Sequence, residues 1–372
     1  MKQQTTNRRE FLKSTSLTAA GLTLSAPPPA RAAAPRIRFA AIGLNHGHIN
    51  GQTNAVLRGG GELVSFYAKE PELIAKYQKD FPQAKLARSE AEILEDKSIQ
   101  LVISASIPVE RAPLGIRVMQ HGKDFMVDKP GVTSLEQMAA VRRVQAQTKR
   151  IYSILFSERL ENPATMKAAE LVKAGAIGKV IQTVSVGPHR VTPASRPAWF
   201  WDTKYYGGII TDICSHQFEQ FLYFTNSTSA EIAASQVRNV NHPQYPNFEV
   251  FGDVLIRCNG GTGYMRVDCF TPDGLSTWGD GRLTVIGTEG FLEIRKNADI
   301  GGRKGGNHLF IVDQKETKYI DCKDVPLTYG TMLVDDILNR TDTALPQTHC
   351  FLAMELAIKA QKMARKLTIT AA

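Results

Sequence analysis

Between residues 36 and 156, short apolar runs alternate with amphipathic segments. The apolar runs have the length of buried strands, and we expect strands at 36–44, 62–68, 101–107, 124–130 and 150–156. The amphipathic segments, several of which end at glycine or proline, predict helices at 49–60, 70–82, 91–100, 111–123 and 134–149. Strands that alternate with helices of this length predict an α/β domain with a doubly wound parallel sheet, which binds ligands at the carboxyl ends of its strands.

The pattern changes after residue 156. One more amphipathic helix is expected at 162–179, and strand-like segments then follow with few helices between them. These strands are expected at 180–190, 248–258, 261–270, 281–288 and 290–296. Their succession predicts a second domain of α+β type with a mostly antiparallel sheet. We divide the chain into domains 33–155 and 156–372, with a last helix at 349–366 that could pack back on the first domain.

The N-terminus has the features of an export signal in the usual order. Arg8 and Arg9 precede a mildly apolar stretch, and Ala30 and Ala32 form the A-x-A pattern of a cleavage site. A disordered basic tail is the alternative interpretation. The order resembles a twin-arginine (Tat) signal, which predicts export to the periplasm by the Tat machinery with cleavage near Ala32. We therefore leave residues 1–32 out of the fold reasoning.

Leaving out this segment changes what the charge implies. The segment contains five basic residues and one acidic residue, so the formal charge of the remaining chain is +5 rather than +9. A charge of +5 without a basic cluster does not indicate nucleic-acid binding. No apolar run in the remaining chain is long enough to span a membrane. The five cysteines contain no C-x-x-C pair, and their odd number does not indicate a disulfide framework.

The first strand ends in a loop that partly matches the dinucleotide-binding pattern G-x-G-x-x-G. Gly43 matches the first glycine, whereas Asn45 and His48 occupy the second and third glycine positions. Asparagine tolerates unusual backbone angles, so Asn45 is compatible with a phosphate-binding loop. An acidic residue that binds the ribose usually follows the second strand, but the chain has Ala68 there. Lys69 could meet a 2′-phosphate instead, which favours NADP over NAD.

Four further motifs give the chain a family resemblance. They are "VDKPGVTSLEQ" at 127–137, "AELVKAGAIGKV" at 169–180, "YYGGIITDICSH" at 205–216 and "TVIGTEGFLEI" at 284–294. In this order they resemble the Gfo/Idh/MocA family, which includes glucose–fructose oxidoreductase and inositol dehydrogenase. The resemblance implies a Rossmann domain followed by an open-faced sheet domain. It also implies a sugar, cyclitol or similar polyol held between a nicotinamide cofactor and the second sheet.

The resemblance also implies catalytic residues. D-K-P at 128–130 corresponds to the family's E-K-P, so Lys129 is the candidate catalytic lysine. G-G-x-x-x-D-x-x-x-H at 207–216 makes Asp212 and His216 the candidate proton-transfer pair. These residue types suit the oxidation of an alcohol, which needs a base for the hydroxyl proton. Asp212 and His216 are four residues apart, which predicts one face of a single helix. The structural alternatives are an exposed lysine at a strand end, a capping aspartate and a buried histidine.

The segment before this helix concentrates aromatic and cationic side chains. We assign the substrate to His189, Arg190, Arg196, Trp199 and Trp201, together with Asp212 and His216. Aromatic rings suit the faces of sugars, and cations suit carboxylates. A packed loop whose tryptophans fill the core is the alternative interpretation.

We assign the cofactor to Gly43, Asn45, His46, His48, Lys69, Ser106, Pro108, Asp128 and Lys129.

The two histidines of the first loop have three interpretations. His48 packs beneath the loop while His46 contacts cofactor or substrate, or both are surface or capping residues. In the third interpretation they bind a divalent metal, Zn²⁺ or Mn²⁺, completed by residues such as Asp128, Asp212 or His216.

The leading functional hypothesis is an exported oxidoreductase that forms a homodimer or homotetramer. It would transfer a hydride between a tightly held NAD or NADP and a sugar, polyol or glycoside. Because the Tat route carries folded proteins, the cofactor would be loaded before export and regenerated by a second substrate. A related reaction is the redox-neutral hydrolysis of a glycoside by transient oxidation, elimination and reduction back. The alternatives are a metal-dependent hydrolase, lyase or epimerase that uses His46 and His48, and a non-catalytic carbohydrate-binding protein.

Overall fold

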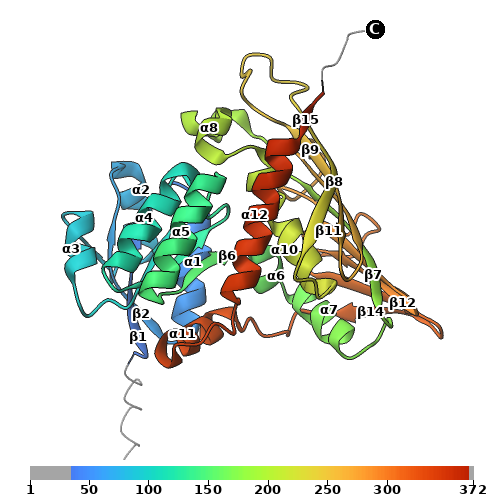
Figure 1. Cartoon of the computed structure of the whole chain (residues 1–372), viewed down its shortest axis with the longest axis horizontal. Helices are drawn as coiled ribbons and strands as arrows, with labels where there is room; N and C mark the ends of the chain where they lie inside the picture. Colours follow the sequence, from blue (N-terminus) through green and yellow to red (C-terminus); the bar gives the residue numbers. More distant parts are fainter. Residues whose placement is uncertain (1–34, 368–372) are drawn as a thin grey trace, which may run out of the picture. The chain divides into compact units, whose positions relative to one another are not determined.

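The computed structural model of the protein describes residues 35–367, and the predicted twin-arginine segment with its cleavage site lies outside this range. Two β-sheets with their helices make up the described part of the chain (Figure 1). None of the helices in this range is both long and apolar enough to cross a membrane. All five cysteines are free thiols.

The first sheet is parallel throughout and has the strand order β3-β2-β1-β4-β5-β6. Its strands are β1 (Ile37–Ile42), β2 (Gly61–Tyr67), β3 (Lys85–Leu86), β4 (Leu101–Ser104), β5 (Asp124–Asp128) and β6 (Tyr152–Leu155). Strands β4, β5 and β6 are buried along their whole length, as the continuous apolar runs predict. The order reverses between β1 and β4, and such a switch point creates a crevice at the carboxyl ends of the strands. The predicted Rossmann sheet is therefore confirmed.

The helices of this sheet follow the predicted alternation. They are α1 (His48–Arg58), α2 (Pro71–Asp80), α3 (Glu90–Glu95), α4 (Pro108–Gln120) and α5 (Leu135–Thr148). The prediction of a helix over 91–100 is wrong in its second half, because α3 ends at Glu95. Asp96 accepts hydrogen bonds from both the backbone N–H and the hydroxyl of Ser98, and this local turn competes with the helix.

The second sheet has nine strands in the order β14-β13-β12-β11-β7-β10-β9-β8-β15. They are β7 (Val180–Pro188), β8 (Ala230–Arg238), β9 (Phe251–Cys258), β10 (Thr262–Asp268), β11 (Arg282–Gly287), β12 (Gly290–Arg295), β13 (His308–Asp313), β14 (Thr317–Asp321) and β15 (Arg365–Lys366). Most neighbours are antiparallel, as expected, but the pairs β7–β10 and β8–β15 are parallel. Strands β8, β13, β14 and β15 had no counterpart in the sequence prediction.

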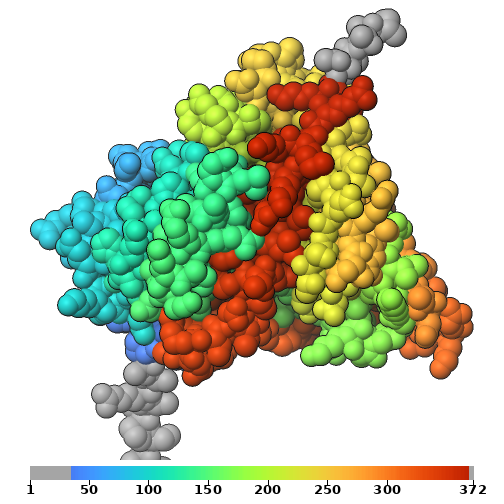
Figure 2. Space-filling view, in the orientation of Figure 1, coloured from blue at the N-terminus to red at the C-terminus, as the bar shows by residue number. Residues whose placement is uncertain are grey.

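Further helices follow β6. They are α6 (Ser157–Leu160), α7 (Pro163–Lys173), α8 (Thr203–Tyr206), α9 (Ile209–Asp212), α10 (Ser215–Phe224), α11 (Tyr329–Asn339) and α12 (Gln347–Met363), with short 3-10 turns η1 (Pro193–Ser195) and η2 (Ala198–Trp201). The last helix, α12, contacts α9, α10 and β8 as well as α5 and β6 of the first sheet. Figure 2 shows this C-terminal segment in red between the N-terminal half and the second sheet. Contacts with elements of both sheets therefore hold α12.

The prediction that Asp212 and His216 share one continuous helix is wrong. Asp212 ends α9, and His216 lies in the first turn of α10. The hydroxyl of Ser215 donates to the backbone oxygen of Asp212 at 2.8 Å, which takes up a carbonyl that a continuous helix would use itself. Gly208 starts α9 at φ +94°, a conformation that favours glycine, and packs directly against the side chain of Gln361 from α12. The interruption gives Asp212 and His216 separate backbone supports.

Candidate active site

A cavity of about 310 Å³ lies where the carboxyl ends of β1 and β5 meet residues of the second sheet and its helices. Eleven predicted site residues line it: His46, His48, Pro108, Asp128, Lys129, His189, Arg190, Arg196, Trp199, Asp212 and His216. The rest of its wall is formed by Arg111, Ser157, Glu158, Phe200, Ile213, Cys269 and Trp278, which the sequence did not single out. The candidate catalytic residues and the candidate substrate loop therefore share one cavity.

A second groove, of about 340 Å³, follows the loops after β1, β2 and β4. The predicted cofactor residues Gly43, Asn45, Lys69 and Ser106 line it. Gly43 has φ +79°, and a Cβ atom there would lie 2.6 Å from Cβ of Ser106, so only glycine fits this turn. Such close approach of backbone and wall is what a dinucleotide-binding loop requires, and the residues present fit a dinucleotide.

This groove contains a carboxylate, although Ala68 occupies the position where an acidic residue usually follows the second strand. Glu70 lines the groove although it lies two residues beyond Ala68. Its Oε1 accepts a hydrogen bond of 2.8 Å from Nδ2 of Asn45, and its Oε2 accepts one from the backbone N–H of Lys69. The asparagine that replaces the second glycine therefore orients an acidic side chain toward the nucleotide groove.

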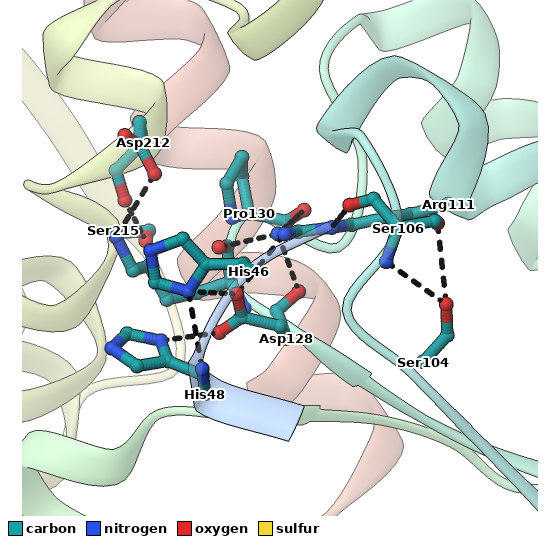
Figure 3. A network of polar contacts seen from close by, with 10 residues as sticks. His46, His48, Ser104, Ser106, Arg111, Asp128, Pro130, Asp212 and Ser215 are labelled. Atoms are coloured by element: carbon teal, nitrogen blue, oxygen red, sulfur yellow. Dashed lines mark hydrogen bonds and ion pairs between the residues drawn. The ribbon is translucent and has the colours of Figure 1, made fainter. Parts of the chain in front are cut away.

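Asp128 organises the first-loop histidines (Figure 3). Nδ1 of His48 lies 2.9 Å and Nδ1 of His46 lies 3.3 Å from its carboxylate oxygens. Arg111, on α4, approaches the same carboxylate at 3.0 Å and also donates to the backbone oxygens of Ser106 and Pro130. Burial alone would raise the pKa of Asp128, but its contacts with His48 and Arg111 outweigh burial and hold that pKa well below the usual value.

The donor set of His46, His48 and Asp128 is a poor fit for a metal. One ligand atom from each lies within 4.8 Å of the others, as a metal site would need. However, both Nδ1 atoms already contact the carboxylate, and the guanidinium of Arg111, a permanent cation, contacts Oδ2, the same oxygen as His46. The cluster is thus a hydrogen-bonded anchor for the loop between β1 and α1.

Lys129 and Asp212 form an ion pair in the cavity. Nζ of Lys129 lies 2.9 Å from Oδ1 of Asp212, and the residues come from the end of β5 and the end of α9. Lys129 is followed by Pro130, which provides no backbone N–H. Burial alone would raise the pKa of Asp212, but the ammonium of Lys129 outweighs burial and keeps that pKa below its usual value. The pair presents a hydrogen-bond donor with a fixed counter-charge.

His216 is a buried, uncharged imidazole in the wall of the same cavity. Its side chain is 3% exposed, and its Nδ1 has no hydrogen-bond partner among the described residues. Burial lowers its pKa to about 3, although the nearby Glu158 acts in the opposite direction. The ring meets Phe156 edge to face. His216 is therefore uncharged near neutral pH, so it has a ring nitrogen that can accept a hydrogen bond.

Only one of the two carboxylate oxygens of Glu158 accepts hydrogen bonds from described residues. Its Oε2 accepts hydrogen bonds from Lys296, Gln217 and Gln220, and no described residue donates to its Oε1. Burial alone would raise the pKa of Glu158, but the charge of Lys296 keeps it well below the usual value. Glu158 thus brings to the wall of the cavity a carboxylate with one free oxygen, Oε1.

The predicted substrate loop divides between the cavity and the core. Trp199, Arg190 and Arg196 line the cavity, and the ring of His189 packs there at a tilt against that of Trp278, with ring centroids 4.6 Å apart. Trp201 does not line it: its ring stacks on Tyr245 at 3.8 Å within a buried aromatic cluster. The two interpretations of the loop, substrate cover and core packing, thus apply to different tryptophans.

Sequence reasoning missed four contributors to the site. Arg111 lies within an ordinary amphipathic helix, and Trp278 lies in a loop. Lys296 follows β12, whose alternation of buried and more exposed residues predicts a strand but no site. Glu158 follows β6 as Lys129 follows β5, at the ligand-binding edge of the sheet. That position is the one signal that could have identified it.

The fold and the site define an oxidoreductase with an NAD-binding Rossmann domain. Residues 37–156 match the model of the oxidoreductase family with an NAD-binding Rossmann fold, and residues 165–293 match the GFO/IDH/MocA C-terminal domain. The chain belongs to the Gfo/Idh/MocA family. A crystal structure from Erwinia carotovora atroseptica, of a protein provisionally described as an oxidoreductase, is 44% identical. It superposes with a TM-score of 0.87 over 89% of this chain and all of that chain.

Two named enzymes are more distant relatives. The scyllo-inositol 2-dehydrogenase (NAD(+)) of Bacillus subtilis is 28% identical over 232 residues, which cover 60% of this chain and 64% of that enzyme. The levoglucosan dehydrogenase of Pseudarthrobacter phenanthrenivorans is 24% identical over 235 residues, which cover 61% of this chain and 57% of that enzyme. The chain thus matches less than two thirds of the length of either enzyme.

Proposed function

We propose that the protein oxidises a secondary alcohol of a sugar or polyol, or reduces the corresponding ketone, with a nicotinamide cofactor. The observation that carries this proposal is the Lys129–Asp212 pair at 2.9 Å, which shares one cavity with the uncharged His216. The names of the relatives support it, because they are dehydrogenases of an inositol and of an anhydrosugar.

The chain's own residues would hold the cofactor and move the proton. Gly43, Asn45 and Glu70 would hold the nucleotide, and a bound nicotinamide would accept or donate the hydride. When the alcohol is oxidised, the hydroxyl proton passes to Nε2 of His216, the ring nitrogen that is not sealed in the interior. Lys129, held by Asp212, donates a hydrogen bond to the same oxygen and stabilises its developing negative charge.

The nucleotide groove favours NAD(H) over NADP(H). The carboxylate of Glu70 lies in the groove after β2, where it would accept hydrogen bonds from ribose hydroxyls and repel a 2′-phosphate. This reverses the preference that Lys69 alone implies. Glu70→Ala should weaken NAD⁺ binding and bring the affinity for NADP⁺ closer to that for NAD⁺.

The test of the proposed function begins with the nucleotide. Denaturing the purified protein and analysing the released small molecules by mass spectrometry should yield NAD(H). Reduction of NAD⁺ is then followed with scyllo-inositol, levoglucosan, D-xylose and related sugars and sugar acids. Lys129→Met should lower kcat by about 100-fold or more, because the loss of one donor that stabilises a developing negative charge costs about that much. The matched control is Lys85→Met, an exposed lysine paired with Glu92. No released or bound nucleotide together with no turnover would refute the proposal.

Export through the Tat route is part of the proposal. Arg8 and Arg9 support it, together with the A-x-A pattern at Ala30 and Ala32. Replacing both arginines by lysine should shift the protein from the periplasmic to the cytoplasmic fraction. A normal periplasmic level of this variant would contradict Tat export.

We also propose that copies pair through the second sheet. Ile181, Leu255, Phe291 and Tyr319 are large apolar residues on its strands, and each is at least 39% exposed. Leu255→Glu should convert a dimer or tetramer to monomer in light scattering. A wild-type protein that is already monomeric would contradict pairing.

A further inference from the structure

The charges that line the active-site cavity do not balance. Three carboxylates face it, and each has a cation within ion-pair distance: Arg111 pairs with Asp128, Lys129 with Asp212, and Lys296 with Glu158. Of the two remaining cations in the wall, Arg190 lies 3.4 Å from the carboxylate of Asp273. Arg196 has no carboxylate partner among residues 35–367. One positive charge in the cavity therefore lacks a counter-charge.

The guanidinium of Arg196 is held in place by neutral groups. Its Nε donates to the backbone oxygen of Val191 at 2.8 Å, and one Nη donates to that of Arg190 at 3.1 Å. Its plane lies 4.4 Å from the ring centre of Phe200. The other Nη makes no hydrogen bond with any described residue. The side chain is thus fixed in orientation and has unused donors, as a preorganised anion site requires.

The neighbouring groups leave Arg196 uncompensated. Burial lowers the pKa of Arg196, and the more distant Cys269 and Asp212 only partly offset this effect. Burial also lowers the pKa of His189 to about 4, so this ring adds no charge of either sign near neutrality. Since a desolvated cation without a partner is costly, a bound anion would relieve this cost.

We infer that the substrate is a sugar acid whose carboxylate binds Arg196, while its hydroxyls meet Lys129, His216 and the free oxygen of Glu158. This inference rests on the proposed function and narrows its substrate class. Trp199 and Trp278 add aromatic faces suited to the carbon skeleton of a sugar. The phosphates of the cofactor could be the anion that Arg196 binds in place of a substrate carboxylate. However, Arg196 does not line the nucleotide groove.

The test compares acids with neutral sugars of the same skeleton. The probes are D-galacturonate with D-galactose, D-glucuronate with D-glucose, and D-gluconate with D-glucitol. Binding to the full protein saturated with NADH is measured by calorimetry at fixed ionic strength. At least one acid should bind about tenfold or more tightly than its neutral partner, since a charge-assisted hydrogen bond contributes about that much.

Variants assign the preference to the arginine. Arg196→Gln should reduce the affinity for the acid by about tenfold or more and change the affinity for the neutral sugar by less than threefold. Arg196→Lys, which keeps the charge, should retain part of the preference. The matched control is Arg282→Gln, a half-exposed arginine that pairs with Asp280 and does not line the cavity. NADH affinity, measured separately, should be the same in all variants.

Three results would overturn the inference: no acid binds better than its neutral partner, the preference survives in Arg196→Gln, or Arg196→Gln weakens NADH binding instead. These failures differ from failure of the proposed function. If a neutral polyol is oxidised and no acid binds, the proposed function stands and the sugar-acid inference fails. If an acid binds through Arg196 and no hydride transfer occurs, the anion site stands and the proposed function fails.

Discussion

Among single residues, Asp128 fixes the loop between β1 and α1 to the rest of the site. It is buried and accepts contacts from His46, His48 and Arg111 as well as from the backbone N–H of Lys129 at 2.8 Å. Its neighbour in sequence, Lys129, is thereby positioned for Asp212. Asp128, which the sequence offered as a candidate metal ligand, thus positions Lys129, the candidate catalytic lysine.

Asp128→Asn should destabilise the protein by about 3 kcal/mol, because it leaves the buried guanidinium of Arg111 without its counter-charge. Urea unfolding monitored by fluorescence measures the difference. The control is Arg88→Gln, which removes an exposed pair with Glu92 and should change stability by less than about 0.5 kcal/mol. Equal stability of Asp128→Asn and wild type would show that the anchor is dispensable.

The residues of the site differ in how far the sequence could predict them. Lys129, Asp212 and His216 were predictable because each occupies a motif position, and the structure brings all three into one cavity. The contact of Lys129 with Asp212, 83 positions away, depends on how α9 packs, which no local pattern records. Glu70 could not be assigned from the sequence, because it lies two residues beyond the usual position and its place in the groove depends on the hydrogen bond from Asn45.

Among the elements, the break between α9 and α10 determines where Asp212 and His216 lie. Gly208 opens α9 with φ +94°, and a Cβ atom there would lie 2.2 Å from the side chain of Gln361 on α12. The amide of Gln361 in turn accepts the N–H of Ile210 and donates to Glu249. The position of Asp212 therefore depends on the last helix of the chain.

Gly208→Ala should destabilise the protein by about 2 kcal/mol, because an L side chain is strained at this φ and meets Gln361. It should also reduce kcat, since α9 carries Asp212. Gly51→Ala is the matched control: Gly51 lies exposed within α1 with open space around it, so alanine should stabilise by about 0.5–1 kcal/mol. Thermal unfolding measures both shifts, and a Gly208→Ala protein as stable as wild type would contradict the strain.

The elements themselves were predictable where one pattern dominates. Strands β1, β4, β5 and β6 are buried on both faces and read as continuous apolar runs. By contrast, β14 is mostly exposed and β8 places only two of its nine residues in the buried class, so neither shows clear alternation. Such strands form because the neighbouring strand of the sheet offers backbone hydrogen-bonding partners. These partners come from the tertiary fold, so the local sequence does not reveal them.

At the scale of the whole molecule, histidines with lowered pKa values link folding to pH. Burial lowers the pKa of His46 and His189 to about 4 and that of His216 to about 3, whereas histidine in an unfolded chain titrates near about 6.5. Between these values the unfolded chain binds more protons than the folded protein. Stability therefore increases with pH across this window and is lost as the pH falls below about 6.5.

Buried His216 should contribute a slope of up to about 1.4 kcal/mol per pH unit, and the half-buried His46 and His189 should contribute less because solvent screens them. Urea unfolding between about pH 5 and pH 7.5 should therefore give a total slope of about 2–3 kcal/mol per pH unit near the lower end. His216→Gln should remove about 1.4 kcal/mol per pH unit from this slope. A flat profile would mean that His216 binds protons equally in the folded and unfolded states, and it would contradict the lowered pKa of the buried imidazole.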